Sequence, residues 1–157
     1  MATSDRKLAP FTPAQERFGN VVIKVMSTLN TWVYRATGGR VGGRFLRGAP
    51  VLLLTTTGRK SGERRTAPLL YLADQDRFVI VASKGGFSHH PAWYLNLEKS
   101  PDVTVQVGSD RREMRARIAN DTEKQHLWPK LVAMYRDYDD YQARTDRKIP
   151  VVVLEGR

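Results

Sequence analysis

The stretch VLLLTTTGRKSGERRTAPLLYL, residues 51–72, decides the fold of this 157-residue chain. Two strand-like apolar runs flank a short turn that is rich in glycine and in cations. Gly58 and Gly62 permit a tight reversal, and we expect them to leave backbone N–H groups free to point at a ligand. The stretch therefore predicts an antiparallel hairpin with a binding element at its tip.

Positive charge surrounds this turn. Arg59, Lys60, Arg64 and Arg65 lie in it or beside it, and arginine guanidinium groups suit phosphate or carboxylate oxygens. A second cationic corner, residues 84–86, ends a later apolar run. From the residues alone, a solvated basic loop explains the first turn about as well as an anion site does. Two such corners on neighbouring strands predict a pocket for an anionic cofactor.

The composition limits the kind of partner. The formal net charge is +10, which calls for nucleic acid, an anionic membrane surface or an acidic small molecule, and charge alone does not choose among them. The chain has no cysteine, which excludes disulfides, thiolate metal ligands and a cysteine nucleophile. No apolar run is long enough to span a membrane and no signal-peptide core is present, so we expect an intracellular, cytoplasmic protein.

An amphipathic helix is predicted near the N-terminus. Thr12, Pro13 and Gln15 form a typical helix start with a capping box, and the helix should run to about Tyr34 and stop at Gly38. Apolar residues recur at helical spacing, and we expect this stripe to pack on the rest of the fold. The stripe consists of Phe18, Val22, Val25, Met26, Leu29 and Trp32.

The remaining chain predicts an α+β fold in one domain, residues 13–157, after a disordered polar tail at residues 1–12. Strands are expected at residues 51–57, 65–72, 77–82, 103–107, 113–118 and 149–155, and helices at 91–99, 120–135 and 138–145. Turns at residues 74–76 and 108–110 join strands as hairpins. Strands joined by hairpins, with helices gathered at the ends, favour an antiparallel sheet or barrel over a doubly wound parallel sheet.

At this point the sequence resembles a known family. Residues 49–62 (APVLLLTTTGRKSG), Pro68, residues 82–84 (ASK), residues 91–96 (PAWYLN) and residues 135–147 together resemble the deazaflavin-dependent nitroreductases of actinobacteria. The resemblance extends over nearly everything from Leu29 to Glu155 and implies a split antiparallel β-barrel of the FMN-binding type, flanked by helices. It also implies coenzyme F420, an 8-hydroxy-5-deazaflavin with a phosphate and a polyglutamate tail, which donates hydride from ring carbon 5.

The resemblance assigns roles to residues. Those that match the cofactor site are Arg59, Lys60, Ser61, Gly62, Arg65, Pro68 and Lys84. Those that match the acceptor side are Ser83, Tyr135, Tyr138 and Tyr141. Leu70 stands where some members active on bulky nitro compounds have an aromatic residue.

Each of these residues also has a plainer explanation. Ser83 could simply cap a strand end, and tyrosines spaced three apart are commonly the edge of an amphipathic helix. His89, His90 and His126 show no ligand constellation, so we expect no metal. The first helix could rest on an anionic bilayer at the inner face of the plasma membrane, in which case lipid-soluble quinones become natural acceptors.

The function predicted from the sequence is transfer of hydride from reduced F420 to a nitro compound, a quinone or an enone, by a monomer or homodimer that binds no nucleic acid. A related barrel that uses FMN is the nearest alternative. A basic nucleic-acid-binding barrel is a more distant one, because the strands lack aromatic residues interleaved with Lys and Arg.

Overall fold

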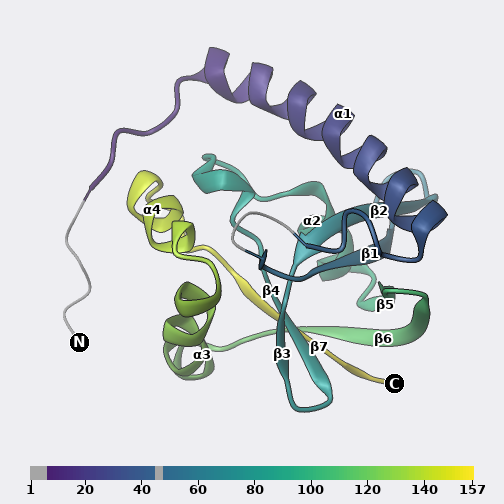
Figure 1. Ribbon diagram of the computed structural model, residues 1–157. Helices are drawn as coiled ribbons and strands as arrows, with labels where there is room; N and C mark the ends of the chain where they lie inside the picture. Colours follow the sequence, from purple (N-terminus) through teal and green to yellow (C-terminus); the bar gives the residue numbers. More distant parts are fainter. Residues whose placement is uncertain (1–6, 45–47) are drawn as a thin grey trace.

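The computed structural model describes residues 7–44 and 48–157 (Figure 1). Within them the strands are β1 (Val51–Thr57), β2 (Arg64–Leu70), β3 (Leu72–Asp74), β4 (Arg77–Val81), β5 (Asp102–Val107), β6 (Asp110–Ile118) and β7 (Val151–Gly156). The helices are α1 (Pro13–Thr37), α2 (Ala92–Lys99), α3 (Asp121–Met134) and α4 (Asp137–Arg144), with a short 3-10 turn, η2 (Lys84–Gly86). The strands form one sheet in the order β2-β1-β5-β6-β7-β4-β3, and every neighbouring pair is antiparallel. The predicted α+β class with an antiparallel sheet is confirmed.

The sheet is rolled. β2 and β3 are its two edge strands, yet only Tyr71 separates them along the chain. The edges must therefore approach each other, as they do in a barrel. The sequence predicted one strand over residues 65–72, and this was wrong. The chain leaves the pairing with β1 at Leu70, the Tyr71 N–H donates to the Pro50 carbonyl at 3.1 Å, and Leu72 then pairs with Val79 of β4.

Other boundaries differ by a few residues. β6 begins at Asp110 rather than at residue 113, because the turn before it needs only residues 108 and 109, with Gly108 at a φ of 61°. Pro129 lies inside α3, and the helix ends at Met134, so Tyr135 lies outside it. The predicted hairpin turn after Asp74 is confirmed, with Gln75 in the left-handed region at a φ of 59°.

The core has two parts because several strands are buried on both faces. Leu52, Leu54 and Val152 belong to the cluster inside the rolled sheet, together with Leu97 of α2. Alternate residues of β4 and β7 belong to a second cluster under α3 and α4, which includes Leu131. Burial on both faces explains why β1 and β7 read as continuous apolar runs instead of alternating ones.

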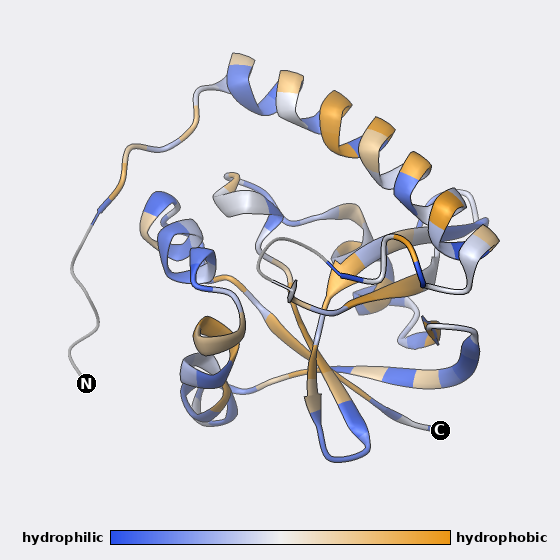
Figure 2. Cartoon of the chain, viewed as in Figure 1, coloured by the Kyte–Doolittle hydropathy of each residue, from blue (hydrophilic) through white to orange (hydrophobic). Residues whose placement is uncertain are grey.

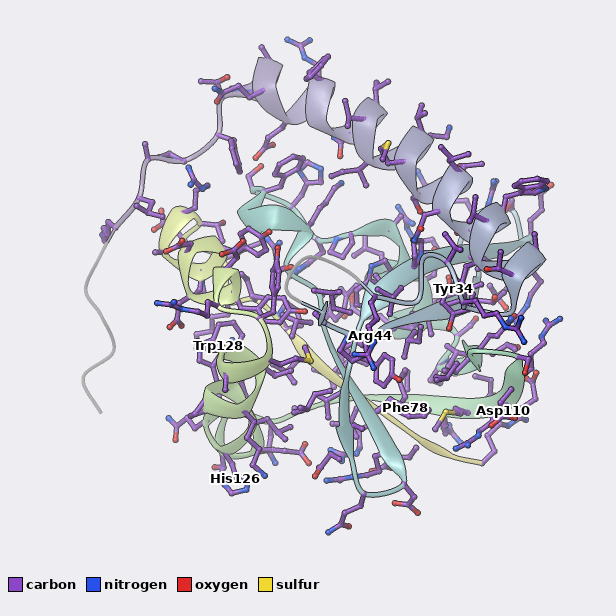
Figure 3. All side chains as sticks on the ribbon, in the orientation of Figure 1. Tyr34, Arg44, Phe78, Asp110, His126 and Trp128 are labelled. Carbon is purple, nitrogen blue, oxygen red and sulfur yellow. The ribbon has the colours of Figure 1, made fainter. Side chains whose placement is uncertain are left out.

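Helix α1 lies across one side of the sheet (Figure 1). Its predicted start is confirmed: the Thr12 hydroxyl accepts from the Gln15 N–H and the Gln15 side chain accepts from the Thr12 N–H. Its end is confirmed too, with Gly38 as a left-handed cap at a φ of 60°. Tyr34, labelled in Figure 3, is 1% exposed, and its hydroxyl donates to the Val51 carbonyl at 3.1 Å and accepts from the Gly108 N–H at 2.7 Å. Tyr34 therefore anchors this end of the helix.

The apolar stripe of α1 does not pack on the sheet. All six of its predicted residues are exposed, from Val22 at 42% to Phe18 at 73%, and the apolar colour along α1 stands out in Figure 2. The predicted packing was wrong because the buried positions of α1 are Glu16, Thr31 and Tyr34, which lie off the stripe. Since burying apolar surface is favourable, a large exposed apolar face of this kind is typical of an interaction surface.

The predicted N-terminal tail falls partly on residues 1–6, which lie outside the described residues. Of the remainder, the Leu8 N–H donates to the Ala143 carbonyl at 3.0 Å, and the Ala9 carbonyl accepts from Arg144 at 3.1 Å. The segment before α1 thus contacts α4. Among the helices of residues 7–44 and 48–157, none combines the length and apolar character needed to cross a bilayer.

Candidate active site

A cavity of about 800 Å³ lies between the β1–β2 turn, the loop after β4, α1 and α2. Ten of the eleven residues that the sequence predicted for the site line this cavity: Arg59, Lys60, Ser61, Arg65, Pro68, Ser83, Lys84, Tyr135, Tyr138 and Tyr141. The eleventh, Gly62, belongs to the β1–β2 turn but does not line the cavity. The structure therefore brings the two predicted cationic corners and the tyrosine-rich segment to one place.

The glycine N–H groups of the β1–β2 turn make hydrogen bonds within the turn itself. The Gly58 N–H donates to the Glu63 carbonyl at 2.7 Å, and the Gly62 N–H donates to the Gly58 carbonyl at 2.9 Å. Our expectation that these glycines leave N–H groups for a ligand was wrong, because the tight reversal uses both of them. Gly62 does supply the left-handed conformation, at a φ of 72°. An anion at this turn would therefore have to be held mainly by the cationic side chains.

The two arginines at the start of β2 point in opposite directions. Arg65 lines the cavity and lies 3.0 Å from the exposed carboxylate of Glu63. Arg64 instead donates to Thr57 of β1 at 3.0 Å and to Thr104 of β5 at 2.7 Å. Successive residues of a strand face opposite sides, which explains the difference. Arg64 therefore makes hydrogen bonds within the sheet, whereas Arg65 lines the cavity.

Asn96 of α2 holds the cationic turn in place, a role that sequence reasoning missed. It is 4% exposed, and its Oδ1 accepts from both the backbone N–H and the guanidinium of Arg59, each at 3.1 Å. Its Nδ2 donates to the buried Thr56 hydroxyl at 3.1 Å, and Lys99 one turn on donates to the Arg59 carbonyl at 2.9 Å. The only signal in the sequence was the place of Asn96 in the family-like motif at residues 91–96.

The second corner has an unusual backbone. Lys84 has a φ of 45°, which is uncommon for a residue with a side chain, and Gly85 and Gly86 follow at 62° and 83°. Such conformations cost about 1–3 kcal/mol and persist where the surroundings impose them, often at functional sites. Burial lowers the pKa of the Lys84 ammonium, and the Glu16 carboxylate partly opposes this.

Arg147, in the segment before β7, imposes this conformation. Its guanidinium donates to the backbone carbonyls of Ala82 at 3.1 Å, Ser83 at 2.6 Å and Phe87 at 2.8 Å. It also contacts His90 Nδ1 at 3.1 Å. One partly buried cation therefore holds both ends of the loop that presents Ser83 and Lys84. The sequence carried no signal for this role beyond the position of Arg147 at the end of the family-like segment.

The three tyrosines converge rather than form a stripe on one helix. Tyr135 lies in the bend between α3 and α4, while Tyr138 and Tyr141 belong to α4. The ring centroids lie 5.1–6.3 Å apart, and the hydroxyls of Tyr135 and Tyr141 are 3.1 Å apart. Burial raises the pKa of the Tyr135 and Tyr138 hydroxyls well above the ordinary value, so both stay protonated at neutral pH. They can therefore act as hydrogen-bond donors.

The inner face of α1 forms the remaining wall of the cavity, which sequence reasoning also missed. Its lining residues are Asn20, Ile23, Lys24, Ser27 and Thr28. Their only signal in the sequence was that most of them are polar residues of α1 outside the predicted apolar stripe. Trp93 of α2 also has two roles, since it packs against the core and lines the cavity.

The histidines do not form a metal centre. His89 contacts Lys84, His90 contacts Arg147, and His126, labelled in Figure 3, is exposed on α3. Across residues 7–44 and 48–157, no three His, Cys, Asp or Glu side chains gather in a way that could hold a metal ion.

Comparisons with known proteins agree with this geometry. Residues 26–156 match the family model described as F420H(2)-dependent quinone reductase. The F420H(2)-dependent quinone reductase Rv1261c of Mycobacterium tuberculosis is 43% identical over 132 residues, which cover 82% of this chain and 89% of that protein. A solved F420-H2 dependent reductase (FDR-A) is 42% identical with a TM-score of 0.63, over 68% of this chain and 94% of that one. A solved structure described as a domain-swapped dimer is 36% identical with a TM-score of 0.65, over 82% and 96%.

The rolled antiparallel sheet and its cationic cavity thus belong to a class of deazaflavin-dependent reductases. Within that class, the chain is a member of the F420H(2)-dependent quinone reductase family.

The residues of the cavity suit the cofactor that the family name implies. A deazaflavin with a phosphate and a polyglutamate tail needs an apolar slot for the ring and cations for the tail. Pro68, Leu70 and Trp93 supply apolar surface, and Arg59, Lys60, Arg65 and Lys84 supply positive charge. The volume of about 800 Å³ is within the range of small-molecule sites.

Proposed function

We propose that this protein reduces quinones with F420H2, and that nitro compounds or enones of similar size are further acceptors. The observation that carries the proposal is the continuity of one cavity from the cationic β1–β2 turn to the buried tyrosines. An anionic cofactor would lie at the first end and an electron-poor acceptor at the second. We also take the rolled sheet to be a split β-barrel of the flavin-reductase type.

The roles of the residues follow from their places in the cavity. Arg59, Lys60, Ser61, Gly62, Arg65, Pro68 and Lys84 hold the deazaflavin, and Ser83, Tyr135, Tyr138 and Tyr141 face the acceptor. When bound, F420H2 supplies a hydride, and a quinone that gains one hydride and one proton becomes a hydroquinone. The protein contributes orientation, charge matching and exclusion of water.

The tyrosines stabilise the charge that develops on the acceptor. Hydride addition places negative charge on a quinone oxygen, and a donor aimed at that oxygen lowers the barrier. Tyr135 and Tyr138 keep their protons at neutral pH because burial raises the pKa of both hydroxyls. The proton that completes the hydroquinone comes from a tyrosine hydroxyl or from solvent.

Leu70 favours quinones over bulky nitroaromatic compounds as acceptors. It lines the cavity at the end of β2, where an aliphatic side chain offers apolar contact but no stacking surface for a large ring. The names of the relatives agree, since they are described as quinone reductases.

The proposal is tested in two stages. Fluorescence titration with oxidised F420 measures binding, and FMN is titrated beside it under the same conditions. The decay of F420H2 absorbance is then followed with a benzoquinone, a naphthoquinone, a nitroaromatic compound and a cyclic enone. We expect F420 to bind more tightly than FMN and the quinones to react fastest.

The alternatives give different results in the same assay. Tighter binding of FMN than of F420 would indicate that the cofactor is a flavin and not a deazaflavin. Binding of F420 without turnover of any acceptor would make the protein a cofactor carrier. Salt-dependent retention of DNA without binding of F420 would favour a nucleic-acid-binding barrel.

We further propose that the exposed stripe of α1 rests on an anionic membrane surface. An amphipathic helix with the exposed Arg17 beside its apolar face, on a protein of net charge +10, suits anionic lipid headgroups. Lipid-soluble quinones would then enter from the side of the helix. The same stripe could instead be covered by a second copy, and one relative is described as a domain-swapped dimer.

Vesicle sedimentation distinguishes a membrane from a second copy of the chain as the surface that covers the stripe. The double variant Val25→Ser/Trp32→Ser should bind phosphatidylglycerol vesicles at least about tenfold more weakly, because it removes apolar area from the stripe. Ile118→Ser, at an exposed apolar residue of β6, is the matched control. A concentration-dependent dimer with no vesicle binding would assign the stripe to a second copy.

A further inference from the structure

Glu16, in the first turn of α1, is a buried carboxylate that the proposed function does not use. It is 9% exposed. Its Oε1 accepts from the Ser88 N–H at 2.7 Å, and its Oε2 accepts from the Ser88 hydroxyl at 2.8 Å. Hydrogen bonds to charged groups are among the stronger ones. The two hydrogen bonds between Glu16 and Ser88 join α1 to the loop that follows Ser83 and Lys84.

Aromatic packing brings the same two segments together. Phe87 lies edge-on to Phe11, with ring centroids 5.2 Å apart. A Cβ on Gly19 would lie 2.6 Å from Phe87 Cζ, so only a glycine lets the helix approach the ring this closely. Glu16 and Gly19 thus attach the N-terminal end of α1, and Tyr34 attaches the other end. The helix crosses the cavity between these two attachments.

Glu16 also reaches Lys84 through His89. The Lys84 Nζ lies 3.0 Å from His89 Nε2. Because an ammonium group can only donate, Nε2 accepts and the ring proton is on Nδ1. That Nδ1 lies 3.6 Å from Glu16 Oε2. The carboxylate therefore lies at the end of a short chain of polar groups that begins at a cation of the cavity.

We propose that Glu16 is a positioning residue of the reductase: it holds α1 across the cavity and fixes the loop that presents Ser83 and Lys84. This inference rests on the proposed function, because the cavity is the one assigned to F420. Glu16 acts through Ser88 and His89 and does not itself line this cavity.

The charge of Glu16 has a separate effect on Lys84. Burial lowers the pKa of the Lys84 ammonium, Arg147 lowers it further, and Glu16 raises it. His89 is the other titratable group that faces Lys84, and Lys24 of α1 lines the same cavity. Removing the carboxylate therefore lowers the Lys84 pKa, so the ammonium loses its charge at a lower pH. The binding of an anionic cofactor should then weaken at a lower pH than in the wild type.

Two variants distinguish the attachment of α1 to the loop from the effect of the Glu16 charge on Lys84. Ser88→Ala removes one hydrogen bond to Glu16 and keeps the carboxylate, so it also keeps the favourable charge at the start of the helix. Glu16→Gln removes the charge. Asp76→Asn, at the exposed tip of the β3–β4 hairpin, is the matched control for the loss of one negative charge.

Amide hydrogen exchange tests the attachment without any cofactor. We expect α1 and residues 83–89 to exchange about tenfold faster in Ser88→Ala and in Glu16→Gln, because each loses hydrogen bonds to a charged group, while β1 and β7 stay as in the wild type. Unchanged exchange in both variants would overturn the proposal, whatever the binding results.

Titration with oxidised F420 from pH 6 to pH 10 tests the effect on the site. We expect affinity to fall about tenfold in Glu16→Gln at pH 7, with its alkaline decline moved to lower pH. Ser88→Ala should weaken binding with the alkaline decline unmoved, and Asp76→Asn should match the wild type. Faster exchange with unchanged affinity in both variants would overturn the positioning role.

The two proposals can fail separately. Absence of F420 binding by the unaltered chain would refute the proposed function before any variant is compared. The attachment of α1 by Glu16 would still be decided by the exchange measurement.

Discussion

At the scale of single residues, the site depends on which side chains the strands and loops turn toward the cavity. Arg64 and Arg65 are neighbours of the same type, yet one donates to threonines of the sheet and the other lines the cavity. Tyr135 and Tyr141 come from different elements, yet their hydroxyls are 3.1 Å apart. Each pair leads to a substitution with a matched control.

Arg65→Ala should weaken F420 binding about 10- to 100-fold, because a charge-assisted hydrogen bond contributes roughly 1.5–3 kcal/mol. Arg65 is well exposed, so its contribution should shrink as added salt screens the charge. Fluorescence titration at low and high salt measures both effects. Arg64→Ala is the control and should leave affinity within about twofold of the wild type. Equal losses in the two variants would remove Arg65 from the site.

Tyr135→Phe should slow quinone reduction roughly tenfold or more while F420 affinity is unchanged, because it removes a donor to the developing negative charge. Burial raises the pKa of Tyr135, so its hydroxyl stays protonated and the wild-type rate should show no decline from this group between pH 6 and pH 9. Steady-state rates across that range provide the measurement. Tyr94→Phe, in the core cluster inside the sheet, is the control. A rate equal to the wild type would exclude Tyr135 as a donor.

At the scale of elements, helices hold the loops of the candidate site from outside. α2 holds the β1–β2 turn through Asn96, and α1 forms a wall of the cavity with its polar face. The apolar face of α1 is left exposed as a result, since a helix cannot turn both faces inward. A partner that binds the exposed apolar face of α1 would therefore contact the same helix that forms a wall of the cavity.

Asn96→Ala should lower the free energy of unfolding by about 1–3 kcal/mol, because it leaves the Arg59 N–H and the buried Thr56 hydroxyl without a partner. The melting temperature should fall by roughly 2–4 °C for each kcal/mol. F420 binding should weaken as well, because the turn is no longer held. Asn96→Asp keeps the acceptor for Arg59 and should retain most of the stability. Thermal unfolding with F420 titration on both variants would show whether α2 positions the turn.

At the scale of the whole molecule, ion pairs close the side of the sheet that lies away from α1. Arg117 of β6 pairs with Glu123 of α3 at 2.6 Å and with Glu155 of β7 at 2.9 Å, and Arg77 of β4 lies 3.6 Å from Glu155. Hydrogen bonds from Arg117 lower the pKa of both glutamates. Their contribution to stability is therefore present at neutral pH and is lost as the pH falls through their lowered pKa values.

Arg117→Met should reduce the free energy of unfolding at pH 7 by about 1 kcal/mol, since the group is partly exposed. The pH dependence between pH 5 and pH 2 should flatten, because the two glutamates then titrate nearer to their unfolded values. Denaturant unfolding at several pH values measures this. Arg112→Met, which breaks only an exposed pair with Asp110, should change stability by a few tenths of a kcal/mol at most. Parallel curves for Arg117→Met and the wild type would refute the linkage.

The sequence by itself determined the elements that depend on neighbours along the chain. The capping box at Thr12, the left-handed end at Gly38, the hairpin around Gly58–Gly62 and the continuous strand at residues 151–155 all follow from local backbone preferences and apolar runs. The antiparallel sheet could also be predicted from the sequence, because strands joined by short turns pair antiparallel, whereas parallel pairing needs a long crossover. The candidate site residues came from a motif, and their convergence was an expectation of the family resemblance.

Only the tertiary structure decided which distant groups meet. Asn96 reaches Arg59 across 37 residues, Arg147 reaches Ser83 across 64, and Glu16 reaches Ser88 across 72. No local pattern encodes such contacts, because they exist only once the sheet has rolled and brought β2 and β3 to adjoining edges. The outward direction of the α1 stripe has the same origin: the helix is oriented by its two attached ends, and its amphipathic pattern alone cannot say which face those ends turn toward the cavity.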